Sequence, residues 1–182
     1  MTRDRLTGVP RRGSQRWLRP TLYLLALIAV QSLLSRLAEA VGVAAPDLFL
    51  LTGAALAWRL APLPALLAAY GVGLLQDVLG AGTLGFHAAG VAGGALLVMF
   101  VRRYVGDGSI FQGLLSVVAA VVGEWLAFLV LNYVLRMGLI TQASLMQTVP
   151  AVFLGTLIVS GVWERLIVWG LGERSGSEET FS

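Results

Sequence analysis

Residues 73–77 read GLLQD and close one apolar stretch of the chain, and residues 84–87 read LGFH and open the next. Glycines in the short connection between the two stretches indicate a turn, so the pattern predicts a hairpin of two apolar helices. This hairpin carries a carboxylate at Asp77, an amide at Gln76 and the only histidine of the chain, His87. Because polar groups at a membrane boundary rarely lack a role, we expect a structural latch or a contact site here.

The composition excludes a soluble domain. Hydrophobic residues make up 57% of the 182 residues, charged residues only 13%, and the mean hydropathy is +0.82. These values predict an integral membrane protein that forms one compact unit, because several spans of about 20 residues take up nearly the whole length. Cysteine is absent, which rules out disulfides and thiolate metal sites.

The apolar segments are separated by glycine, proline and charged breaks, and they predict an all-α polytopic membrane domain over residues 20–171. A basic tail at 1–19 precedes this domain, and a short Ser/Glu-rich tail at 172–182 follows it and is expected to be disordered. The second and third segments either cross the membrane or form a re-entrant pair, because about 14 residues make only about 21 Å of helix. About six helices are expected, at approximately 20–42, 47–60, 63–80, 84–101, 109–136 and 145–170.

The arginines predict the orientation of the domain, because basic residues concentrate on the cytoplasmic side of membrane proteins. All 13 basic residues are arginine, and six apolar helices with a cytoplasmic amino terminus leave only Arg36 and Arg136 on the exterior. Both termini are therefore predicted to be cytoplasmic. The other arginines also lie where they can contact anionic lipid headgroups.

Small residues at a spacing of four predict where helices pack closely, because they let two backbones approach each other in a membrane. One such stripe leads into Asp77, and a second follows His87 on the next helix. We expect them to bring these two helices together, although one stripe could instead face a partner protein. The stripes consist of Ala65, Ala69 and Gly73 on the first helix and of Gly90 and Gly94 on the second.

Ionisable residues in these spans need a compensating environment. Asp77 lies at the carboxyl end of its helix, where the helix dipole disfavours a negative charge. The turn relieves this by bringing near it the first backbone N–H groups of the next helix, with Thr83 as its expected cap and His87 as a hydrogen-bond partner of Asp77 or Gln76. Glu124 lies near the middle of the fifth span, so it predicts either a structural partner within the bundle or a functional polar pocket.

The residues expected of common active sites are missing. One histidine and no cysteine do not make the usual zinc sites, and Ser160 lacks the preceding glycine of a nucleophile elbow. Nothing in the sequence places Asp77 and Glu124 at a shared scissile bond, and no phosphate-binding glycine loop or basic nucleic-acid-binding domain is present. We therefore expect a protein without enzymatic activity, cofactor, metal site or nucleic-acid partner.

Four short stretches resemble the MreD family, the bacterial rod shape-determining membrane proteins. They read PDL at 46–48, GVGLLQD at 71–77, LGFHA at 84–88 and RR at 102–103, so the resemblance covers about residues 46–104. It implies a noncatalytic multi-pass subunit of the cell-elongation machinery in the bacterial inner membrane. Such a subunit is expected to bind MreC and, through it, the peptidoglycan glycosyltransferase RodA, its transpeptidase partner and the MreB cytoskeleton.

The same resemblance implies a six-helix fold similar to that of the substrate-capture subunits of energy-coupling-factor transporters. It assigns no catalytic residue, and it makes Asp47, Gln76, Asp77 and His87 structural or partner-contact positions. The fold similarity also leaves an alternative function open, the capture of a vitamin-type small molecule. That function needs an outward-facing pocket with convergent polar groups. The expected external connections are short, and they leave Trp125, Asn132, Gln142 and Gln147 to line such a pocket.

Overall fold

The computed structural model describes residues 14–80, 83–104, 110–136 and 142–172, and this part of the chain is entirely helical apart from its turns. The predicted all-α class and the six predicted helices are confirmed. The helices are α1 (Ser14–Val41), α2 (Leu48–Arg59), α3 (Pro62–Leu79), α4 (Phe86–Val101), α5 (Ile110–Val134) and α6 (Gln142–Leu171).

The first helix begins at Ser14, inside the stretch predicted as a basic tail, and Pro20 lies within it. Hydropathy locates the part of a helix that suits the bilayer and does not locate its end, because a polar turn can stay helical in water. Among the residues of α1 whose side chains are described, the candidate membrane span is Leu18–Val41. At the other terminus α6 ends at Leu171, next to the predicted boundary at 172.

Four helices are long and apolar enough to cross a membrane, namely α1, α3, α5 and α6. The other two are shorter, with 12 residues in α2 and 16 in α4, which correspond to about 18 Å and 24 Å of helix. The sequence singled out 47–60 and 63–80 as short, whereas the helices of limited length are α2 and α4.

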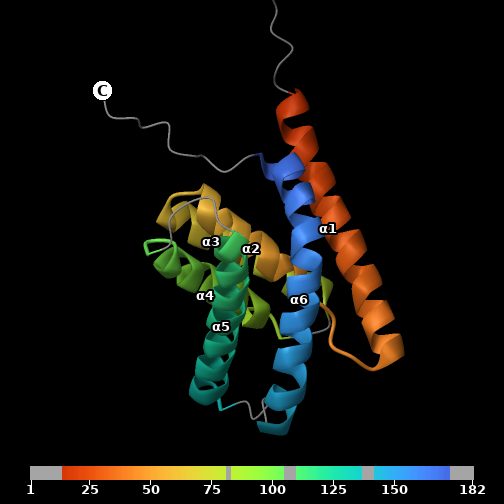
Figure 1. Cartoon of the computed structure of the whole chain (residues 1–182), viewed down its shortest axis with the longest axis vertical. Coiled ribbons are helices and arrows are strands. Elements are labelled where there is room, and N and C mark those ends of the chain that lie inside the picture. Colours follow the sequence, from red (N-terminus) through yellow and green to blue (C-terminus); the bar gives the residue numbers. More distant parts are fainter. Residues whose placement is uncertain (1–13, 81–82, 105–109, 137–141, 173–182) are drawn as a thin grey trace, which may run out of the picture.

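Figure 1 shows α1 and α6 side by side along the long axis of the molecule, with α5 on the other side of α6 and the remaining helices gathered around the upper part of α5. The lower ends of α5 and α6 extend past this group. At the upper end, Tyr23 of α1 packs on Trp163 of α6 with ring centroids 6.0 Å apart, and both side chains are buried. The helices α2, α3 and α4 therefore form a group against α5, next to the pair of α1 and α6.

The arginines of the described residues separate to opposite ends of the bundle. Arg59 donates from Nε to the carbonyl oxygen of Gly172, 3.1 Å away, and Arg102 donates to the carbonyl oxygen of Ala57. These bonds place the carboxyl ends of α2, α4 and α6 together. The chain then runs along α5 to the opposite end, where Arg136 follows the helix.

Candidate functional site

Asp77 is the centre of the α3–α4 hairpin, and its side chain is fully buried. Its Oδ2 accepts hydrogen bonds from the backbone N–H of Gly85 at 2.8 Å and of Ala88 at 3.1 Å. Its Oδ1 accepts from the backbone N–H of His87 at 3.0 Å and lies 2.8 Å from the Nδ1 of the same residue. An ionised carboxylate only accepts, so Nδ1 carries the proton that it donates to Asp77. The expected contact of Asp77 with the start of the next helix and with His87 is therefore present.

The capping of α4 differs from the expectation. Gly85 is the N-cap, with φ +91° and no side-chain cap, so Thr83 does not cap the helix. Asp77 supplies the acceptor that a capping side chain normally provides, because its two oxygens reach three N–H groups at the start of α4. The left-handed backbone at residue 85 favours glycine at this position.

Gly73 makes the hairpin possible one turn before Asp77. A Cβ atom at this position would lie 2.5 Å from the carbonyl oxygen of His87 and 2.6 Å from the Cα of Ala88. Ala65 and Ala69 on the same stripe are completely buried, and Ala69 faces Gly53 of α2. The predicted close approach of α3 and α4 is thus correct.

The second stripe has a different partner from the predicted one. A Cβ at Gly90 would meet the ring of Phe128 on α5. One at Gly94 would lie 2.8 Å from the carbonyl oxygen of Ala120 on α5 and 2.7 Å from Leu50 Cδ1 on α2. Gly90 and Gly94 therefore pack α4 against α5 and not against α3. A spacing of four residues identifies a face that permits close approach, but every helix has several neighbours, and the spacing does not specify which one meets that face.

Residues 46–48 are held in place from three other helices. Asp47 caps α2 by accepting from the backbone N–H of Leu50 at 2.8 Å, and its other oxygen accepts from Gln76 Nε2 at 2.9 Å. Its own N–H donates to Thr156 Oγ1 at 3.0 Å. Gln31 of α1 accepts from the N–H of Leu48 at 2.9 Å and donates to the carbonyl oxygen of Pro46 at 3.0 Å.

Sequence reasoning missed Gln31 and Thr156. Each is a polar side chain near the middle of a long apolar helix, and this position was the available signal, because such side chains bond across helices in membranes. The sequence did not specify the partner, since Gln31 meets residues about 15 positions away and Thr156 meets one 109 positions away.

Most of the sequence-predicted site residues meet in one cavity of about 400 Å³, which we call the recess. Asp77 lies behind it, bonded to His87. Phe86 stacks on Phe128 at the recess with centroids 4.4 Å apart, and α5 continues for six residues beyond that contact. The lining includes Gln31, Asp47, Gln76, His87, Glu124 and Thr148 together with Phe86, Trp125 and Phe128.

The expectation that few polar groups are available to line a pocket was wrong. Trp125 belongs to the lining as expected, but Asn132 does not, and the side chains of Gln142 and Gln147 lie outside the described part of the structure. The polar lining comes mainly from residues that the sequence assigned to helix ends and spans. Helix tilt brings them together, and tilt is set by packing between helices.

Glu124 is the least compensated group of the recess. The residue is 2% exposed, and no hydrogen bond joins its carboxyl group to another of the described residues. The charged group that acts on it electrostatically is Asp47, which is also acidic. Two further buried atoms of the lining, Gln76 Oε1 and Trp125 Nε1, have no hydrogen-bond partner among the described residues. Of the two roles left open for Glu124, the described contacts favour the polar pocket.

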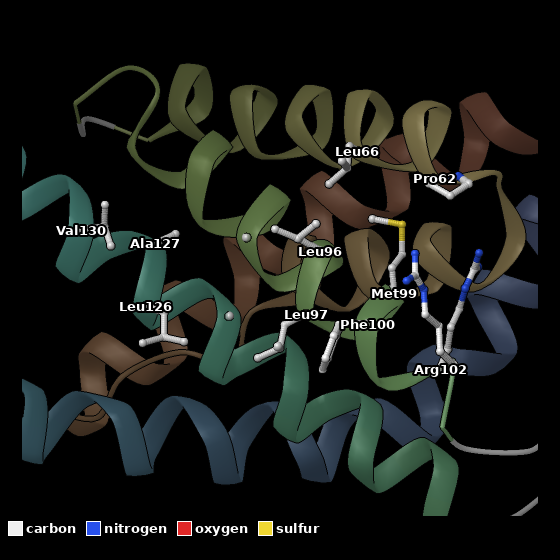
Figure 2. Close-up of a pocket in the computed structure, with 13 residues that line it drawn as sticks. Pro62, Leu66, Leu96, Leu97, Met99, Phe100, Arg102, Leu126, Ala127 and Val130 are labelled. Carbon is white, nitrogen blue, oxygen red and sulfur yellow. The ribbon is translucent and has the colours of Figure 1, made fainter.

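A second cavity of about 710 Å³ lies between α3, α4 and α5 and has a different character (Figure 2). Its walls are aliphatic and aromatic side chains such as Leu66, Leu96 and Phe100. Arg102 stands at one end of the cavity (Figure 2), and together with Arg103 it supplies the charged groups of the lining. Apolar walls next to basic groups suit the surface that a membrane protein presents to lipid.

The chemistry of the recess does not include a ready metal site. Among the described residues, no group of three or more His, Asp or Glu side chains could hold a metal ion. No protein-family model, curated protein or solved structure matches this chain. A function therefore has to be inferred from the site itself.

Proposed function

We propose that this protein is a noncatalytic scaffold of the MreD type in the bacterial inner membrane. It binds MreC and, through MreC, the RodA synthase with its transpeptidase partner and the MreB cytoskeleton. The observation that carries this proposal is the convergence of PDL at 46–48, QD at 76–77 and His87 around one recess. These segments belong to three of the four stretches on which the resemblance to MreD depends.

The contacts of these residues suit a scaffold. Asp77, Asp47 and Gln31 use their side chains to hold backbone groups of neighbouring segments. Such bonds fix the relative positions of helices, because each buried bond that is lost leaves a donor or acceptor without a partner. A rigid recess framed in this way is a suitable receptor for a segment of MreC.

The separation of the arginines supports the proposed orientation. Arg59 and Arg102 lie at the end of the bundle where α6 finishes, and Arg136 lies toward the other. In the proposed orientation the first end and both termini are cytoplasmic. Each basic residue near anionic lipid then contributes about 1 kcal/mol to membrane attachment.

Co-purification with MreC tests the proposal. The two proteins are co-expressed, and MreC is recovered through an affinity tag on this chain in mild detergent. Ala45→Trp places a large ring at the recess lining and is expected to reduce MreC recovery, whereas Ala40→Trp on the exposed surface of α1 is the matched control. Absence of MreC from the unaltered preparation would sink the proposal. Equal recovery of MreC with both variants would instead show that MreC does not contact the recess.

A second candidate function is the capture of a small molecule for a transporter. The recess favours it, because a cavity of about 400 Å³ with polar and aromatic walls has the size and chemistry of a small-molecule site. Native mass spectrometry of the protein purified without MreC separates the two functions. A tightly retained vitamin-like molecule would support capture and count against the scaffold.

A further inference from the structure

The recess has an excess of hydrogen-bond acceptors. Gln76 donates from Nε2 to Asp47 Oδ2, and this bond fixes the orientation of its amide, because a carboxylate accepts and does not donate. Gln76 Oε1 is then left buried without a partner among the described residues. Glu124 adds a carboxyl group to which none of them donates. A ligand that fits this lining must bring donors.

The charge of the recess is equally one-sided. Asp47 and Glu124 contribute carboxyl groups, whereas neither arginine nor lysine occurs in the described lining. The Nδ1 of His87 is already committed to Asp77. A carboxylate buried without a counter-charge is strongly unfavourable, so a cation that enters the recess stabilises the charged form of Glu124.

Aromatic rings complete the lining. Phe86 and Phe128 are stacked, and Trp125 meets Phe128 edge to face with centroids 5.6 Å apart. The faces of aromatic rings attract ammonium and guanidinium groups, most strongly where water is excluded. Acceptors, carboxylates and ring faces together therefore select an organic cation over a neutral ligand of the same shape.

We infer that the recess binds an ammonium or guanidinium group, with Glu124 as the counter-ion and Gln76 Oε1 as an acceptor. The orphan N–H of Trp125 adds a site for an acceptor elsewhere on the ligand. The cation comes either from a small amine or from a lysine or arginine side chain of the bound membrane partner. Only the second source rests on the proposed scaffold function.

Binding of a matched pair of probes to the purified full chain in lipid nanodiscs tests the inference. Phenethylammonium carries the predicted group next to an aromatic ring, and 2-phenylethanol has a similar shape without the charge. Tryptophan fluorescence reports binding, because Trp125 lines the recess. We expect phenethylammonium to bind at least about tenfold more tightly than the alcohol, which corresponds to one well-compensated charge. Equal affinity of the two probes would overturn the inference without any variant.

Glu124→Gln isolates the counter-ion. The variant keeps the shape of the side chain and is expected to lose about tenfold in phenethylammonium affinity, while the affinity for the alcohol stays the same. Glu39→Gln removes an equal charge from the exposed surface of α1 and serves as the control. Unchanged phenethylammonium affinity in Glu124→Gln would contradict the inference. Should Glu124→Gln not fold, Glu124→Asp retains the charge and must retain the preference for the ammonium probe.

The source of the cation is distinguished on the MreC complex. If a basic side chain of MreC occupies the recess, phenethylammonium does not bind the complex, and Glu124→Gln lowers MreC recovery. If a small amine is the ligand, the probe binds the complex and the isolated protein alike. Failure of MreC to co-purify removes the scaffold proposal but leaves the probe measurement on the isolated protein valid, so the two failures are distinguishable.

Discussion

The α3–α4 hairpin and the recess beside it each bury a carboxyl group, and the two groups have opposite environments. Asp77 accepts from three backbone N–H groups and from the ring of His87. Glu124 receives no hydrogen bond from any described residue, and its charged neighbour is another acid. A saturated carboxylate stabilises a fold, whereas an unsatisfied one is a liability unless a ligand compensates it. The hairpin therefore serves structure, and the recess is available for binding.

The largest expected effect comes from separating the two helices of the hairpin. Gly73→Leu inserts a side chain where even a Cβ would lie 2.5 Å from a backbone carbonyl of α4. Backbone cannot yield as a flexible side chain does, so we expect a loss above about 3 kcal/mol and little folded protein. Thermal unfolding in detergent measures the loss of stability, and the recovery of MreC measures the amount of folded protein that still binds. Gly71→Leu is the control, because a Cβ there meets nothing within 4 Å. Equal thermal stability and equal MreC recovery of both variants would show that the hairpin does not depend on the close approach at Gly73.

Removing the charge of the saturated carboxylate should have the next largest effect. In Asp77→Asn one oxygen becomes an NH₂ group that faces N–H donors, so bonds are lost at Gly85 and Ala88 or at His87. We expect a loss of about 2 kcal/mol, since bonds to charged groups contribute about 1.5–3 kcal/mol. Chemical unfolding monitored by circular dichroism tests this value. Stability equal to that of Glu39→Gln would show that Asp77 is not the latch.

A smaller loss is expected where one bond joins α6 to the recess wall. Thr156→Val keeps the shape of the side chain and removes the acceptor of the Asp47 N–H. A single neutral hydrogen bond contributes about 1 kcal/mol, and that is the expected decrease in the free energy of unfolding. Ile158→Val, a conservative change on the exposed face of the same helix that removes no hydrogen bond, is the control. A loss no greater than that of the control would show that this bond contributes nothing.

The smallest expected effect is an unchanged or increased stability, whereas the other variants lose stability. Glu124→Gln removes an acid next to Asp47 to which none of the described residues donates, so the variant should be as stable as the unaltered protein or more stable by up to about 1 kcal/mol. Thermal unfolding without added ligand is the measurement, with Asp77→Asn as the comparison. A loss similar to that of Asp77→Asn would mean that Glu124 has a structural partner, and the contrast between hairpin and recess would disappear.

The hairpin was predictable because its contacts are local. Asp77 and His87 are ten positions apart across a short turn, so chain connectivity alone brings them close. Hydropathy similarly predicted the helices, since it depends on runs of neighbouring residues. The predicted partner of Gly90 and Gly94 was wrong, because it depends on the rotation of a helix about its axis. The predicted cap at Thr83 was wrong because α4 begins later, with Gly85 as its N-cap.

The recess was not predictable in the same way. Gln31, Asp47 and Gln76 come from different helices, and Glu124 from a fourth, so no spacing in the sequence relates them. A polar residue in an apolar helix indicates that some partner exists, but it does not identify the partner.

The sequence by itself determined that this chain is a helical membrane protein, that it has six helices, and that Asp77 meets the start of the fourth helix. These features follow from hydrophobicity and hydrogen bonding over short stretches of chain. Only the tertiary structure decided that α2 and α4 are the shorter helices and that Glu124 faces a polar recess. The tilt, rotation and depth of each helix result from many small packing contacts between segments that are distant in the sequence. No single stretch of the sequence therefore predicts them.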